Sequence, residues 1–132
     1  GKIIRLLFSV STLSVIHLLI LCGANVNEID TDWSFTRPLH MIARCSNIDI
    51  AKPIIQLLHA QGAHADCIDS RGNLPEDLAL EPTVKEFLRS NRNLSLRCRC
   101  AQIIVSKRIN YQKYLSSNLI TFVRLHNNKL YN

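Results

Sequence analysis

Cysteine is the residue type best suited to bind a metal or react in this 132-residue chain. The five cysteines are Cys22, Cys45, Cys67, Cys98 and Cys100. The sequence has no CxxC pair, and on a helix the side chains of Cys98 and Cys100 would point about 200° apart, too far to share one ion. We therefore expect reduced thiols, no metal and no cofactor, as in a cytoplasmic or nuclear protein.

His40 is a second candidate for chemistry, as a catalyst or a ligand. The sequence offers it no Ser/His/Asp set, no pair of carboxylates and no Gly-rich phosphate loop. We therefore expect no catalytic residue and no intrinsic enzymatic activity. A structural hydrogen bond is the more economical role for this imidazole.

Charge is distributed unevenly along the chain. Residues 1–84 hold six Lys/Arg and nine Asp/Glu, a net charge of −3, whereas residues 85–132 hold ten Lys/Arg and one acid, a net charge of +9. A basic half can bind nucleic acid or an acidic protein. Because the basic half lacks both the Gly-aromatic pattern of an RNA-binding sheet and the paired ligands of a zinc finger, we expect no nucleic-acid partner.

The first 22 residues allow two interpretations. Lys2 and Arg5 followed by the apolar stretch LLFSVSTLSVIHLLILC resemble a secretory signal, which would be cleaved near Cys22. Polar residues dilute the stretch, which is also poor as a membrane-spanning helix. The alternative is a degenerate repeat unit with a helix over about 13–22, and we expect no membrane association.

The elements that would hold these residues are set by an internal repeat. The segment from Gly23 to Asp30 (GANVNEID) aligns with the segment from Gly62 to Asp69 (GAHADCID). Each follows an apolar helix, and the apolar positions at 15, 16, 18, 19 and 20 and at 54, 55, 57 and 58 predict a buried face on each helix. Each glycine can end its helix in the left-handed conformation. Pro38 and Pro75 then suit first helical turns, where no N–H partner is lost. Further on, Thr83 and Glu86 have the spacing of a capping box, which predicts the start of a short helix through Phe87 and Leu88.

The pattern resembles the ankyrin repeat, GAxVNxxDxxGxTPLHxA. The resemblance implies an all-α ankyrin-repeat solenoid in which the imidazole of His40 ties adjacent hairpins together. It also implies that Trp33 and Phe35 lie near the tip of a hairpin loop, where they are candidates to bind a substrate. The expected boundaries are a degenerate or truncated repeat at 1–22, repeats at 23–90, a helical box at 94–126 and a tail at 127–132.

The box begins with an amphipathic helix. Leu96, Cys100 and Ile104 stand at i, i+4 and i+8 on one face, with Ile103 beside them, and Ser95 can cap the start. The small Cys100 would let a partner approach closely. The order small residue, Leu, three residues, Cys, three residues, aliphatic resembles the elongin-C-binding box of the von Hippel–Lindau and SOCS-box families. The alternative is an ordinary helix that caps the solenoid.

The residues that follow carry a more specific resemblance. They include Ile109-Asn110-Tyr111-Gln112, Leu115, Leu119, Phe122-Val123 and Leu125-His126. This order resembles the end of the Feminization (Fem) proteins, ankyrin-repeat substrate receptors of cullin-2 ubiquitin ligases, whose tail runs SLxCLAxRA, INY and IPxxLxxFVxxH. A SOCS-box ankyrin protein, the nearest rival, would usually carry an LPLP-like segment, which is absent here. Two departures from the Fem tail matter, Cys100 in place of Ala and Ser116 in place of Pro.

The Fem resemblance implies a non-catalytic adaptor that binds elongin C (with elongin B) and cullin-2 and presents a protein substrate for ubiquitination. The implied elongin-binding residues are Leu96, Cys100, Ile103 and Ile104. The implied cullin-binding residues are Leu115, Leu119, Phe122 and Val123. Because Ser116 replaces the Pro, we expect weaker cullin association. The alternative function is a general ankyrin-repeat scaffold with no link to a ligase.

Overall fold

The secondary structure in the part of the chain that the structure describes is helical. The computed structural model describes residues 13–30, 36–92 and 94–126. Its elements are α2 (Leu13–Leu21), α3 (Pro38–Ala43), α4 (Ile48–Ala60), the 3₁₀ helix η2 (Pro75–Leu78), α5 (Pro82–Ser90), α6 (Leu96–Ser106) and α7 (Ser117–Leu125). These ranges contain no strand, only an isolated bridge between Asp30 and Thr36, so the predicted all-α class is confirmed. Among the described helices none is long and apolar enough to span a bilayer.

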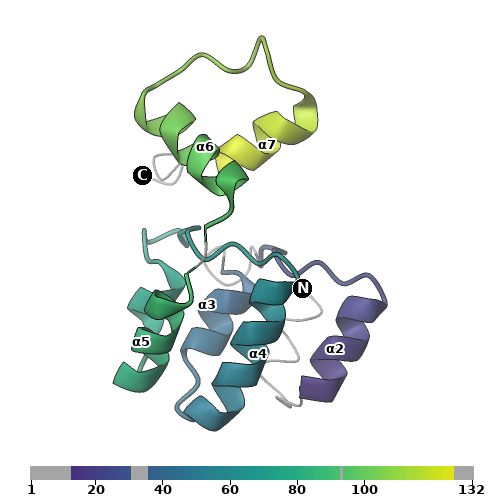
Figure 1. Ribbon diagram of the computed structural model, residues 1–132, viewed down its shortest axis with the longest axis vertical. Helices are drawn as coiled ribbons and strands as arrows, with labels where there is room; N and C mark the ends of the chain where they lie inside the picture. The colour runs from purple at the N-terminus through teal and green to yellow at the C-terminus, as the bar shows by residue number, and fades with distance from the viewer. Residues whose placement is uncertain (1–12, 31–35, 93, 127–132) are drawn as a thin grey trace.

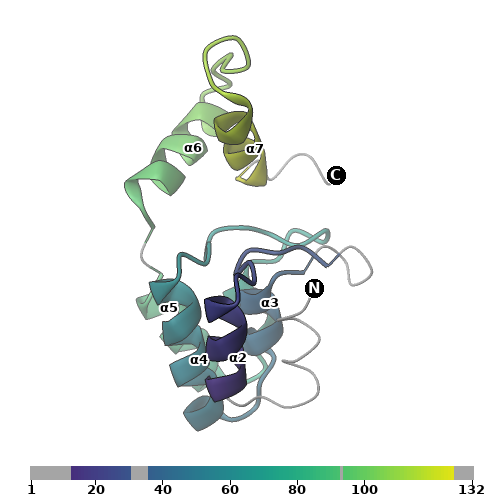
Figure 2. The same cartoon turned by 90° about the vertical axis from the view of Figure 1, so that its right-hand side faces the viewer.

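The helices form two packed rows and a separate pair. In one row α2 packs on α4 and α4 on α5, and in the other α3 packs on η2. The pair α6 and α7 pack on each other and lie beyond one end of the rows, as two perpendicular views show (Figures 1 and 2). Among the described elements, neither α6 nor α7 packs on a helix of the rows. The position of the pair therefore depends on contacts with connecting segments.

The internal repeat in the sequence corresponds to a repeated helix ending. Gly23 and Gly62 take φ values of 89° and 85°, the left-handed region that glycine enters most readily. After α2, the N–H of Ala24 donates to the carbonyl of Leu19 at 3.0 Å, and after α4 the N–H of Ala63 donates to that of Leu58 at 2.9 Å. Both bonds belong to the Schellman helix ending. The predicted equivalence of the two segments is confirmed at this level.

The core lies between the two rows and is formed by apolar side chains at helical spacing. Its largest fully buried members are Ile16, Leu39, Ile54, Ile55, Leu58 and Val84. The prediction of a buried face on the first helix was only partly right, because Val15 is 37% and Leu18 60% exposed. Since α4 is the only described helix that contacts α2, only one face of α2 is covered.

Side-chain hydrogen bonds link the first half of the rows to the second. The His40 Nε2 lies 3.1 Å from the Asn73 carbonyl, to which it can only donate. The Arg37 guanidinium donates to the Ile68 carbonyl at 3.0 Å. Asn27 accepts the N–H of His64 at 2.8 Å and donates to the Gly62 carbonyl at 3.0 Å. The predicted structural hydrogen bond of His40 is confirmed, and it links α3 to the loop around Asn73.

One predicted helix start was wrong. Thr83 and Glu86 have the spacing of a capping box with Thr83 as the N-cap, but α5 begins two residues earlier than this predicts. Pro82 occupies the first helical position and Glu81 is the N-cap. Proline fits there because its fixed φ matches the helix and the N–H it lacks would have had no partner. Proline therefore set the start of α5.

The buried imidazole of His40 makes stability depend on pH. Burial lowers its pKa from 6.5 to about 4, so the unfolded chain takes up a proton at a higher pH than the folded chain. Its contribution is therefore complete above pH 6.5 and is lost as the pH falls towards 4. Between pH 7 and pH 5 we expect His40 alone to lower the free energy of unfolding by about 2 kcal/mol.

Urea unfolding at the two pH values, compared with His40→Gln, isolates this contribution. Glutamine retains an N–H donor but cannot titrate, so the variant should lose about 2 kcal/mol less on acidification. The other histidines titrate equally in both proteins. Equal losses in the two proteins would show that His40 is not the group responsible.

Candidate functional site

Helix α6 begins with a local cap and carries two different faces. The Ser95 hydroxyl accepts the N–H of Cys98 at 3.2 Å, which satisfies one free donor of the first turn, so the predicted cap is confirmed. Cys98 and Ala101, three residues apart, are 3% and 1% exposed. They define the inner face, which turns towards α7 and the segment that follows Gly62.

The outer face of α6 holds the four residues expected to bind elongin C. Leu96 is 78% and Ile103 55% exposed, Cys100 is exposed and Ile104 is half-buried. Covering a leucine this exposed with a partner would be favourable, because it removes apolar surface from water. The structure therefore brings these residues together on one accessible stripe, and no described residue covers Leu96.

The four residues expected to bind cullin do not form one accessible surface. Leu119 is 37% exposed and Leu115 is half-buried. Phe122 is half-buried and Val123 is only 3% exposed. Because the side chain of Val123 is enclosed within this chain, it offers no surface to a partner and serves to hold α7.

The contact between the helical pair and the rows is a buried polar cluster. We call His64, Asp66, Cys98 and His126 the junction cluster. They come from the segment after Gly62, the first turn of α6 and the end of α7, and one donor atom from each lies within 4.8 Å of the others. His64 Nδ1 is 3.2 Å from Cys98 Sγ, and His126 Nε2 is 3.3 Å from Asp66 Oδ2.

Neighbouring groups orient the members of this cluster. The Gln102 amide donates to Asp66 Oδ2 at 2.8 Å. The Ser95 hydroxyl donates to Cys98 Sγ at 3.1 Å. His126 Nδ1 lies 2.9 Å from the Phe122 carbonyl, which can only accept, so Nδ1 carries a hydrogen and Nε2 faces Asp66. Each side chain is thereby held in one orientation.

Electrostatics in the cluster follow from burial and from the Asp66–His126 pair. Burial alone would raise the pKa of Asp66, but the His126 imidazole more than offsets this and lowers it. Burial alone would lower the pKa of His126, but the Asp66 carboxylate more than offsets this and raises it. For His64 burial prevails, and its pKa is lowered. Burial likewise raises the pKa of the Cys98 thiol.

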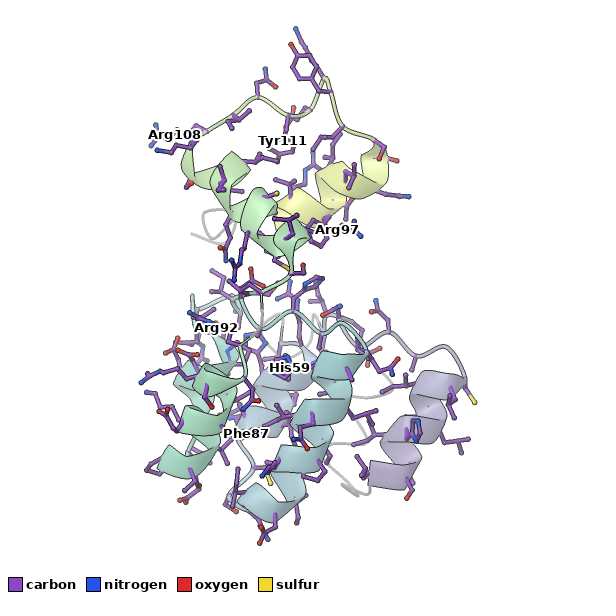
Figure 3. The ribbon with its side chains drawn as sticks, in the orientation of Figure 1. His59, Phe87, Arg92, Arg97, Arg108 and Tyr111 are labelled. Atoms are coloured by element: carbon purple, nitrogen blue, oxygen red, sulfur yellow. The ribbon has the colours of Figure 1, made fainter. Side chains whose placement is uncertain are left out.

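A cleft of about 620 Å³ opens beside the junction cluster, lined by both the rows and the helical pair. The Phe122 ring lies in its wall, 5.3 Å from the ring of His64 and 4.7 Å from that of His126 between centroids. The Arg97 guanidinium stacks 4.6 Å from the centre of the Phe122 ring. Figure 3 shows Arg97 on α6 beside α7, with His59 at the facing end of α4.

The sequence left this cluster unassigned. The expectation of no metal considered only Cys98 and Cys100, whose side chains do diverge, since Cys98 is buried and Cys100 exposed. The signals that could have found the cluster were His64, which replaces Asn in the aligned copy, and His126. The two residues expected to bind substrate, Trp33 and Phe35, lie outside the described residues.

The chain resembles known proteins over most of its length. Across 116 residues, 87% of the chain, it is 35% identical to the protein fem-1 homolog C of Homo sapiens and of Bos taurus. It is 32% identical over 117 residues to the Danio rerio fem-1 homolog C. The chain spans 18% of the length of these curated relatives. No family model matches it.

The described architecture first defines the class, an all-α protein with two rows of helices and an appended helical pair. The similarity to fem-1 homologs then defines the family: the chain belongs to the Fem family, as the residues from Ser95 to His126 predicted.

The bond between Gln102 and Asp66 should stabilise the junction. A hydrogen bond to a buried carboxylate contributes about 1.5–3 kcal/mol. We expect Gln102→Leu to lower the free energy of unfolding by this amount, because Asp66 Oδ1 already has no hydrogen-bond partner among the described residues.

The matched control is Gln112→Leu, on the exposed loop between α6 and α7, which should change stability by less than about 0.5 kcal/mol. Both variants are compared by urea unfolding. If Gln102→Leu is no more destabilised than the control, the bond is not one that holds the junction.

Proposed function

We propose that this chain is the adaptor end of a substrate receptor for a cullin-RING ubiquitin ligase and binds elongin C, with elongin B, through the outer face of α6. The observation that carries the proposal is the exposure of Leu96, at 78%, on the face opposite the buried Cys98. In this role the chain has no catalytic residue, and ubiquitin transfer takes place on other subunits.

The exposure distinguishes this role from that of a simple cap. A helix that only caps a solenoid turns its largest apolar residues inward, because burying a leucine contributes roughly 1.5–3 kcal/mol. Here the inner face holds a thiol and an alanine, and Leu96 and Ile103 face outward. An outward apolar stripe suits a partner pocket, and the small Cys100 between the larger groups allows close approach.

The second helix of the pair supports a cullin contact of smaller extent than the sequence implied. We propose that Leu115 and Leu119 face cullin-2, while Phe122 and Val123 hold α7 against the junction. Figure 3 places Tyr111 on the connecting loop between α6 and α7, near these residues in the chain. The cullin surface would then include this loop.

The rows of helices support the substrate side of the proposal. Two aligned helix endings, the tie from His40 to the next hairpin and the row packing of α2, α4 and α5 are the features expected of stacked ankyrin repeats. We propose that residues 23–90 are such repeats and that they lead into the substrate-binding part of the receptor. The alternative, a general ankyrin-repeat scaffold, predicts no recovery of elongin B/C.

Leu96 should supply much of the binding energy for elongin C. Loss of its burial in Leu96→Ser should weaken binding by about 10- to 150-fold. Cys100→Phe should abolish binding for a different reason, because a large ring blocks close approach. Elongin B/C recovery with the purified chain measures both effects, and circular dichroism checks that helicity is retained.

Leu80→Ser is the matched control, since Leu80 is 67% exposed but lies on the loop before α5. It should leave elongin recovery unchanged. Undiminished recovery with Leu96→Ser would rule out the proposed surface. Loss of recovery with Leu80→Ser as well would indicate a general effect of removing surface leucines.

Ser116→Pro should improve cullin binding without altering elongin binding. Ser116 is the N-cap of α7 with φ −64° and ψ 159°, and its side chain makes no capping hydrogen bond. Proline has this φ already, so the change should stabilise the turn by about 0.4–1 kcal/mol. Cullin-2 recovery, measured beside elongin B/C recovery and a thermal melt, tests this, and a lower melting temperature would contradict it.

A further inference from the structure

The junction cluster has the composition of a metal site. It contributes two imidazole nitrogens, one thiol and one carboxylate, and its four donor atoms lie within 4.8 Å of one another. Asp66, Cys98 and His126 are 7%, 3% and 3% exposed, so these donors are withdrawn from water. Zinc accepts this mixture of nitrogen, sulfur and oxygen ligands.

The distances are close to those that zinc requires. Bonds of about 2.0–2.1 Å to nitrogen or oxygen and about 2.3 Å to sulfur place tetrahedral ligands roughly 3.3–3.6 Å apart. Two pairs are already close to this separation, 3.2 Å for His64 and Cys98 and 3.3 Å for His126 and Asp66. The remaining pairs, which lie within 4.8 Å, need to close by about 1.5 Å at most to reach these separations, which side-chain rotations can supply.

The pair of His126 and Asp66 requires a cation between its facing atoms. A neutral imidazole with its hydrogen on Nδ1 would present the lone pair of Nε2 to a carboxylate that can only accept, whereas a protonated imidazole would donate from Nε2. Neither His126 Nε2 nor Asp66 Oδ1 has a hydrogen-bond partner among the described residues, although both side chains are at least nine-tenths buried. A proton or a metal ion resolves this contact, and a metal ion also engages Cys98 and His64.

The hydrogen bonds around the cluster are of the kind that orient metal ligands in proteins. Ligating histidines commonly donate their second ring N–H to a backbone carbonyl, as His126 does to Phe122. The carboxylate of Asp66 is oriented by Gln102, and Cys98 Sγ accepts from Ser95. Cys98 also lies in the first turn of α6, where the helix dipole favours a thiolate.

We propose that His64, Asp66, Cys98 and His126 form a structural zinc site that fastens the segment after Gly62 to α6 and α7. All four positions of the tetrahedron are filled by the protein, which is the arrangement of a structural rather than a catalytic zinc. The site would order the helical pair relative to the rows. Its ligand on α6, Cys98, lies on the inner face, so the site leaves the outer face with Leu96 accessible.

Cobalt and zinc titrations of the whole chain, reduced and stripped of metal with a chelator, test the proposal. We expect one Co²⁺ per chain, with the intense visible absorption of tetrahedral cobalt and a near-ultraviolet band for thiolate-to-cobalt charge transfer. Zinc should displace the cobalt and raise the melting temperature, because it binds only the folded chain. Octahedral cobalt spectra, or no binding, would overturn the proposal.

Two cysteine variants assign the ligand. Cys98→Ser should remove the charge-transfer band and weaken zinc binding at least 100-fold, whereas Cys100→Ser, two residues away on the outer face, should retain both. Equal loss in the two variants, or equal retention, would show adventitious metal and overturn the proposal. Should Cys98→Ser not fold, the double variant Cys67→Ala/Cys100→Ser decides, because Cys67, beside Asp66, is the other thiol close to the cluster. Retention of the charge-transfer band in this variant supports Cys98 as the ligand, and its loss overturns the proposal. Gln102→Leu should weaken zinc binding about 10- to 100-fold.

Discussion

The carboxylate of Asp66 is the constraint on which the arrangement of the described residues depends. A buried charge without partners costs several kcal/mol, and this one is 7% exposed. Its partners come from elsewhere in the chain, Gln102 from α6 and His126 from the end of α7. Because neither helix packs on the described rows, satisfying this charge is what sets where the helical pair sits. The requirement is electrostatic and directional, so it fixes an orientation where apolar packing alone would allow sliding.

The segment that contains Asp66, from Gly62 to Asn73, is also hydrogen-bonded to residues earlier in the chain. Asn27 brackets Gly62 and His64, Arg37 donates to Ile68, and His40 donates to Asn73. These groups satisfy backbone atoms that a loop would otherwise expose to water. The segment from Gly62 to Asn73 is therefore the link that positions α6 and α7 relative to the rows. A change that loosened either set of bonds would leave the helices intact but free their relative orientation.

Local features were predictable from the sequence, and the junction was not. Gly62, the Ser95 cap and the tie made by His40 follow from backbone geometry or short-range hydrogen bonds, which residue type and spacing specify. The predicted capping box at Thr83 was wrong because Pro82 competes for the same turn. The extent of burial of α2 was overestimated, because a helix with one neighbouring helix buries only one side. The junction joins residues such as Asp66 and Gln102, 36 positions apart. Their proximity depends on how α6 leaves the rows, which no local pattern encodes.

The orientation of α6 connects the buried junction to the exposed stripe. Leu96 and Cys98 are two residues apart and so lie on opposite sides of the helix; only one of them can face inward. Hydrophobicity alone favours burial of Leu96, yet Cys98 is the one enclosed, 3.2 Å from His64. The polar contacts of the inner face outweigh the burial of one leucine, and Leu96 is left exposed to water. A partner that covers Leu96 would therefore gain the favourable free energy of burying its side chain. The junction therefore does more than hold α6 in place, because by fixing the rotation of the helix it determines which residues a partner can reach.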